Sequence, residues 1–218
     1  MPHKETMQEA LFNKRMLICI FTGFTSGLPL YFIYTLIPAW LRSESVSLKE
    51  IGLFALIGIP YTWKFIWAPI MDRYIPPFLG RRRGWMLITQ VLLLISMAAV
   101  GLFNPLDSLW TIAYLAAAIA FFSASQDIVL DAYRREILPD QELGLGNSIH
   151  VNAYRISGLI PGSLALILAD HIDWVWVYMI VGLFMLAGIA MTLAVKEPDG
   201  ISRPPLTLKE AVVEPFSE

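Results

Sequence analysis

The sequence predicts an all-α integral membrane protein that folds as a bundle of six transmembrane helices. Three observations lead to this prediction. Of the 218 residues, 56% are hydrophobic and only 16% are charged, whereas a soluble domain carries about 25% charged residues. The mean hydropathy is +0.60. The apolar residues also gather in six stretches, each about as long as the roughly 20 residues that a spanning helix needs.

The six apolar stretches follow one another with short connections. They cover residues 16–41, 51–71, 85–106, 109–130, 149–169 and 174–195. The first run is far longer than the core of a signal peptide, so we expect it to be a permanent helix. We expect a cytoplasmic N-terminus (1–15), a transmembrane bundle (16–195) and a cytoplasmic tail or start of a central linker (196–218). Within the tail, residues 206–216 are predicted to form an amphipathic surface helix.

Basic residues in the loops predict the orientation, because loops rich in Lys and Arg stay in the cytoplasm. Twelve of the 16 Lys and Arg residues lie at the N-terminus, in the second and fourth loops and in the tail. The opposite loops hold only Arg42 and Lys49. We therefore expect a multi-pass protein with both termini in the cytoplasm. The external loops are too short for a soluble catalytic module, so we expect no enzyme.

A charged motif separates the second and third stretches. Asp72 and Arg73 end one helix, and Gly80, Arg81 and Arg82 precede the next. The arginines alone could be anchors that carry only topology. An acid at the C-terminal end of a helix, however, meets the unfavourable end of the helix dipole. Asp72 therefore needs a partner, such as an arginine or the N-terminus of another helix.

A second motif closes the fourth stretch. Asp127 and Asp131 are four residues apart and so share a helix face. Asp131 is close enough to the surface to be solvated. Asp127 is deeper, where a charge costs about 2.5–3.5 kcal/mol on insertion scales, and such a group usually faces the interior of a bundle. This favours a functional role for Asp127 over purely structural pairing, with Gln126 as its hydrogen-bonding neighbour.

Both motifs carry a family resemblance. The first resembles the signature of the major facilitator superfamily, in which it acts as a conformational latch. The segments PIMDRYIPPFLGRRRGW and SASQDIVLDAYRREILP further resemble the AmpG permeases, as do GFTSGLPL and KEAVVEPF. That family imports anhydromuropeptides for peptidoglycan recycling and thereby takes part in β-lactamase induction. Its members have twelve or more helices, so the resemblance implies that this chain is the N-terminal half.

Glycines and prolines form a third pattern. Gly23, Gly27 and Pro29 lie in the first stretch; the fifth contains Gly158, Pro161 and Gly162. Small residues four apart let helices approach closely, and proline bends a helix. Tight packing is the favoured interpretation for the fifth stretch. In the superfamily the first helix lines the central cavity, so by resemblance its kink also serves gating.

Three charges are predicted to form a layer inside the membrane. Counted at about 1.5 Å per residue, Lys64, Asp127 and Arg155 all lie roughly 7–12 Å from the cytoplasmic helix ends. Helices four and five are antiparallel neighbours, so we expect Asp127 to meet Arg155. Lys64 would then lack an acidic partner and suit an anionic solute. The rival interpretation is that Asp127 and Arg155 form a static strut.

By resemblance, the predicted function is proton-driven import of GlcNAc-anhydro-muropeptides across the inner membrane of a Gram-negative bacterium. The expected partners are the lipid bilayer, the anionic muropeptide, protons and a second six-helix half, which is another chain or a second copy. We expect no cofactor, no metal and no nucleic acid. Two alternatives stay open: half of an acetyl-coenzyme A-type permease, and a truncated or regulatory six-helix subunit that does not transport alone.

Overall fold

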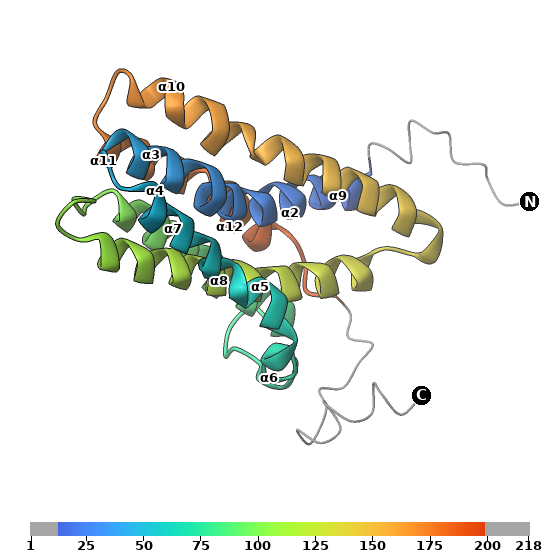
Figure 1. Cartoon of the computed structure of the whole chain (residues 1–218). Coiled ribbons are helices and arrows are strands. Elements are labelled where there is room, and N and C mark those ends of the chain that lie inside the picture. Colours follow the sequence, from blue (N-terminus) through green and yellow to red (C-terminus); the bar gives the residue numbers. More distant parts are fainter. Residues whose placement is uncertain (1–12, 199–218) are drawn as a thin grey trace, which may run out of the picture.

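The computed structural model describes residues 13–198, which are helical apart from their connections (Figure 1). The first 12 residues of the expected N-terminal segment and the tail from residue 199 onward lie outside this range, and with them the predicted surface helix. Within the described residues, five helices are long and apolar enough to cross a membrane. Their bounds are Lys14–Ser43, Arg81–Val100, Leu109–Ile137, Asp140–Ala169 and Trp174–Ala194.

Two of the long helices contain a π-helical turn. The first consists of α2 (Lys14–Tyr31), the π-helical η1 (Phe32–Leu36) and α3 (Ile37–Ser43). The fourth consists of the short 3₁₀ turn η4 (Asp140–Glu142), α9 (Leu143–Ser157), the π-helical η5 (Ile160–Leu164) and α10 (Ala165–Ala169). Pro29 precedes η1 and Pro161 lies in η5. A proline removes an intrahelical hydrogen bond, and η1 and η5 contact each other.

The other three long helices are more regular. The second and third are α7 (Arg81–Val100) and α8 (Leu109–Ile137). The last consists of α11 (Trp174–Leu183) and α12 (Leu186–Ala194). They pack around α2, η1 and α3, with a core that includes Phe32, Trp40 and Tyr178. The Tyr178 ring lies 4.9 Å from the Trp40 ring and 5.2 Å from the Phe32 ring, between centroids.

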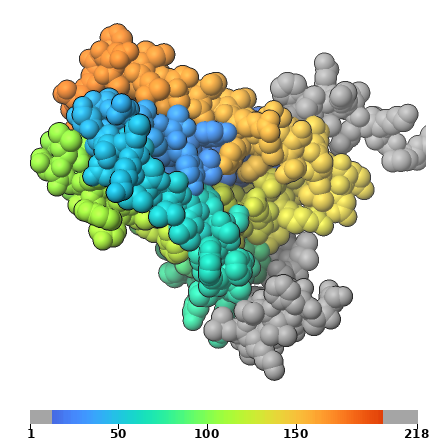
Figure 2. Space-filling view, in the orientation of Figure 1, coloured from blue at the N-terminus to red at the C-terminus, as the bar shows by residue number. Residues whose placement is uncertain are grey.

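The second predicted span is not one regular helix. It is a series of short pieces: α4 (Leu48–Leu53), η2 (Phe54–Gly58), α5 (Ile59–Trp63), η3 (Lys64–Ile66) and α6 (Ala68–Arg73). Prolines at the starts of α5 and α6 remove backbone donors, and η2 and η3 are 3₁₀ turns. This series runs across the face shown in Figure 2. The six-helix count therefore stays a prediction, with five spans present as long helices.

The connections alternate between the two ends of the molecule. The α3–α4, α7–α8 and α10–α11 connections lie at one end, whereas the start of α2 and the α8–α9 connection lie at the other (Figure 1). We call the second the basic end, because its described residues include a group of Lys and Arg side chains: Lys14, Arg15, Arg81, Arg82, Arg83, Arg134, Arg135 and Lys196. The layout agrees with the order of basic and non-basic loops in the sequence.

Candidate functional site: a polar cluster around Asp127

Asp127 lies inside the bundle, where α8 faces α2. The Ser26 hydroxyl donates a hydrogen bond of 2.6 Å to Asp127 Oδ1. Ser26 is buried and Asp127 is half-buried. A carboxylate within a spanning helix is costly unless it is bonded or faces water. The Ser26 hydroxyl therefore stabilises the carboxylate within the bundle.

The structure corrects the expected partner of Asp127. Asp127 forms no ion pair with Arg155 or with any other described residue. The positive charges that act on it come from Lys64 and Arg134, and a negative charge comes from Asp131. Arg134 itself pairs with Asp131 at 3.0 Å. Lys64 thus acts on Asp127 electrostatically, and it forms no ion pair with another residue in the described part of the chain.

Arg155 is exposed on α9, as is Asn152 one turn earlier. The Asn152 amide donates to the Ser148 carbonyl in its own helix at 2.8 Å, and Arg155 makes no contact of this kind with another described residue. A guanidinium facing hydrocarbon at this depth is expensive. This part of α9 is therefore suited to face a water-filled cavity or another protein surface.

Gln126 was predicted to be a hydrogen-bonding neighbour of Asp127, but it bonds to the backbone of α2. Its side chain is fully buried and donates a 3.0 Å hydrogen bond to the Thr25 carbonyl in α2. In a regular helix that carbonyl would accept from residue 29, but Pro29 has no N–H. Gln126 replaces the missing donor. It stabilises α2 at the position where Pro29 interrupts the helical hydrogen bonds.

The sequence analysis missed two tyrosines that interact with Asp127, Tyr61 and Tyr154. Both interact electrostatically with Asp127, and Tyr34 interacts electrostatically with both of them. The Tyr31 and Tyr154 rings are 5.7 Å apart. One signal was available, because Tyr61 and Lys64 are three residues apart and so share a face. We call Ser26, Tyr61, Lys64, Asp127 and Tyr154 the Asp127 cluster.

The glycines of the first span let two helices touch. A Cβ on Gly23 would overlap the His150 carbonyl of α9, and one on Gly27 would overlap the Tyr154 carbonyl and the Ser157 hydroxyl. A Cβ on Gly158 would lie 3.0 Å from the Tyr31 ring. Gly162 has more room, since its Cβ would lie 3.6 Å from Thr35. The spacing in α2 thus holds α9 against α2 beside the Asp127 cluster.

Three of the residues predicted to form a latch, Asp72, Arg81 and Arg82, lie in an ionic network at the basic end. Arg82 donates to Asp72 at 2.6 Å and to Glu136 of α8 at 2.6 and 2.9 Å. Arg81 also pairs with Glu136, at 3.3 Å. Asp72 therefore has the arginine partner that its position required. Arg73 lies apart, with its guanidinium carbon 5.9 Å from the centre of the Tyr74 ring.

Gly80 precedes α7 with a positive φ of 86° and has no side chain to cap that helix. Glu197, just after α12, does so instead. Its two carboxylate oxygens accept from the backbone N–H groups of Arg82 and Arg83 at 2.7 and 3.0 Å, where an acid is favourable. A Cβ on Gly80 would lie 2.7 Å from Glu197 Cδ. The network thus joins α6, α7, α8 and the end of α12, and Glu136 and Glu197 were not predicted.

No group of three or more His, Cys, Asp or Glu residues within the described part of the chain is placed to hold a metal ion. The Asp127 cluster instead offers a carboxylate, an amine and phenol hydroxyls. Such groups can hydrogen-bond a polar solute, and the carboxylate can take up and release a proton.

Comparison with known proteins places the chain in a class. Residues 8–217 match the model of the Major Facilitator Superfamily, and the chain belongs to this family of membrane transporters. The predicted family is confirmed, and so is the prediction that the chain is no enzyme.

Individual relatives are similar over most of this chain. An uncharacterized protein of Haemophilus influenzae is 56% identical over 88% of this chain and 46% of its own length. The anhydromuropeptide permease of Escherichia coli K12 is 46% identical over 94% of this chain and 42% of its own. A putative transporter AmpG 1 of Rickettsia conorii is 32% identical, with 86% and 46% covered. The chain thus spans a little under half the length of these relatives.

Proposed function

We propose that this chain is the N-terminal half of a proton-driven permease in a bacterial inner membrane, which imports GlcNAc-anhydro-muropeptides for peptidoglycan recycling. The similarity to a relative named anhydromuropeptide permease supports the solute class. The observation that carries the mechanism is the hydrogen bond between Ser26 and Asp127 inside the bundle. It holds a carboxylate, which Lys64 influences electrostatically, within helices that are otherwise largely apolar.

Asp127 and Lys64 have complementary roles in this proposal. Protonation of Asp127 would remove its charge and release the positive charge of Lys64 toward a solute carboxylate. Deprotonation would restore the attraction between Asp127 and Lys64 and favour release of the solute. In this way one proton and one anionic solute would be coupled through a single electrostatic pair. Arg155, exposed on α9, would add a second positive charge to the path of the solute.

A second six-helix half, on another chain or a second copy, completes this proposal. Alternating access moves one bundle against another around a site near the middle of the membrane. The exposed Arg155 and Asn152 support such a partner, because hydrocarbon is a poor environment for both. In the complete transporter, the network of Asp72, Arg82 and Glu136 would hold the cytoplasmic ends of this half together as the conformational latch.

The test uses a complete transporter that contains this segment, reconstituted in liposomes with labelled GlcNAc-anhydro-muropeptide. We expect Asp127→Asn to abolish accumulation driven by a pH gradient, while solute exchange without a gradient and the protein level are retained. Lys64→Gln should weaken solute binding, seen as a higher KM. Asp140→Asn is the control, since Asp140 is exposed, pairs with Arg135 at 3.1 Å and is not among the charges that act on Asp127, and this variant should accumulate solute normally.

Two results would contradict this proposal. If Asp127→Asn lowers the protein level but the remaining protein accumulates solute normally, Asp127 only holds helices together and the proposed mechanism is wrong. If the unmodified transporter shows no muropeptide uptake, the proposed solute is wrong.

A further inference from the structure

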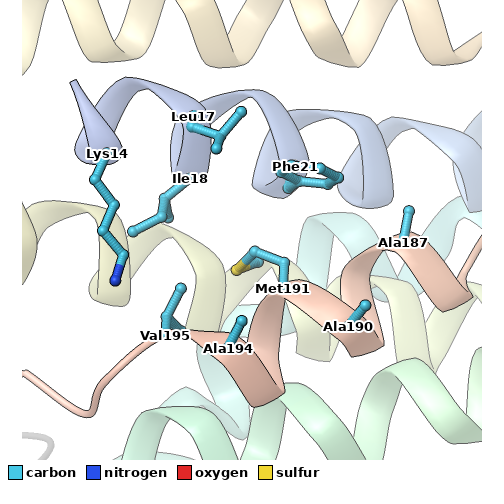
Figure 3. A pocket seen from close by; sticks show the side chains of 9 residues that line it. All are labelled: Lys14, Leu17, Ile18, Phe21, Ala187, Ala190, Met191, Ala194 and Val195. Carbon is cyan, nitrogen blue, oxygen red and sulfur yellow. The ribbon is translucent and has the colours of Figure 1, made fainter. Parts of the chain in front are cut away.

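An apolar groove runs between α2 and α12 (Figure 3), and its lining includes no residue of the Asp127 cluster. Its volume of about 370 Å³ falls within the range of roughly 300–1,000 Å³ that is usual for small-molecule sites. Ile18 and Phe21 line it from α2, and Ala190 and Met191 from α12. Lys14 is the only charged residue in its lining. The groove therefore has an apolar lining with a single cation, Lys14.

The alanines of α12 give the groove its shape. Ala187, Ala190 and Ala194 follow one another at three- and four-residue spacing, which places them on one face. Their small side chains leave a furrow beside α2, and Figure 3 shows them opposite Leu17, Ile18 and Phe21. Ala190 and Ala194 are exposed, and Leu17 is 53% exposed. From Lys14 to Phe21 the furrow extends about 10 Å along the helix axis.

A second, more polar pocket of about 550 Å³ continues the groove at the basic end. The two share Lys14, Ile18 and Val195. The second pocket adds the charged residues Arg15, Glu136, Lys196 and Glu197. The hydrocarbon groove therefore opens into a charged region at the membrane surface, as the tail and the headgroup of a lipid would require.

Most charges of this region are already engaged. Glu136 accepts from Arg81 and Arg82, and Glu197 caps α7. Arg15 pairs with Glu142. Lys14 and Lys196 are both exposed and form no ion pair within residues 13–198. The charge left to meet a ligand is therefore positive, at the mouth of an apolar furrow.

We propose that this groove binds an anionic phospholipid of the leaflet at the basic end, with an acyl chain along the alanine furrow and the phosphate between Lys14 and Lys196. A Lys or Arg residue near the membrane surface contributes about 1 kcal/mol toward anionic lipids, which is about fivefold in affinity. This site is separate from the Asp127 cluster and does not depend on the identity of the transported solute.

The test is native mass spectrometry of the purified chain in detergent with an equimolar mixture of phosphatidylglycerol and phosphatidylethanolamine that carry the same acyl chains. We expect preferential retention of phosphatidylglycerol. Lys14→Gln and Lys196→Gln should each lower that retention about fivefold, with retention of phosphatidylethanolamine unchanged. Lys49→Gln is the control, because Lys49 is an exposed lysine outside the basic end and its removal should have no effect.

A second pair of measurements separates the groove from the headgroup region. Ala190→Phe fills the furrow and should remove the retained phosphatidylglycerol; Ala194→Leu should do so in part, and the melting temperature identifies a variant that merely misfolds. Glycerol phosphate, which has no acyl chain, should fail to displace the lipid. Displacement by glycerol phosphate, equal retention of the two lipids, or no retained lipid would each overturn the proposal. The last result would mean that protein covers the groove.

Discussion

At the scale of single residues, the Gln126 side chain supplies a hydrogen bond that the backbone of α2 cannot form. Pro29 leaves the Thr25 carbonyl in α2 without its intrahelical donor, and the Gln126 amide of α8 donates to that carbonyl at 3.0 Å. In a membrane, no water is available for a freed backbone group, so a neighbouring helix has to supply the bond. The proline in α2 and the glutamine beside Asp127 are therefore one structural unit.

This unit predicts a specific coupling between two substitutions. Gln126→Leu should lower the free energy of unfolding by about 1 kcal/mol, because a buried carbonyl loses its donor. In a Pro29→Ala background the helix supplies its own N–H to Thr25, so the same substitution should cost clearly less. A double-mutant cycle on melting in detergent measures the difference. Equal costs in the two backgrounds would show that Gln126 does not serve the Thr25 carbonyl.

At the scale of elements, the contact between α2 and α9 depends on the absence of two side chains. Gly23 and Gly27 lie so close to the backbone of α9 that a Cβ on either would overlap it. Backbone atoms cannot move aside as a flexible side chain can, so the helices would have to separate. Separation would also move Ser26, between the two glycines, away from its place beside Asp127.

We therefore expect Gly23→Ala and Gly27→Ala to lower both the melting temperature and the amount of protein in the membrane. The matched control is Gly144→Ala in the first turn of α9, where a Cβ would have no neighbour within 4 Å. Alanine is about 1 kcal/mol better than glycine in a helix, so the control should be neutral or stabilising. Unchanged melting of Gly23→Ala would show that α2 and α9 are less tightly packed than described.

A further feature at the scale of elements is the irregular second span. Residues 51–71 are apolar enough to predict one helix, but Pro60 and Pro69 each lie at the start of a new piece. One 3₁₀ turn precedes Pro60 and another lies between the two prolines. Several of its large side chains are exposed, including Leu56, Trp63 and Phe65. Few neighbours within the described residues hold this segment straight. The apolar pattern predicts where a segment lies, whereas its regularity depends on the prolines and on its neighbours.

At the scale of the whole molecule, the alternation of connections predicts an orientation. The connections without basic clusters lie at one end, and the helix ends that carry most of the Lys and Arg residues among the described residues lie at the other. The basic side stays in the cytoplasm during insertion. Reporter fusions after Ile137 and after Lys196 should therefore report cytoplasm, and a fusion after Ser45 should report periplasm. A periplasmic signal after Ile137 or Lys196 would contradict the proposed orientation.

The sequence by itself determined that this is a membrane protein with several spans. Long apolar stretches and the uneven distribution of Lys and Arg among the loops follow from the bilayer, and neither depends on tertiary contacts. The sequence also identified Asp72 and Asp127 as acids in places where a charge is costly, and so as residues that need partners. Those partners were decided only by the tertiary structure. Asp127 accepts a hydrogen bond from Ser26 and forms no ion pair with Arg155, and Gln126 donates to the Thr25 carbonyl that Pro29 leaves without a donor. Such pairings depend on how the helices rotate and approach one another, and this is set by close contacts such as those of Gly23 and Gly27.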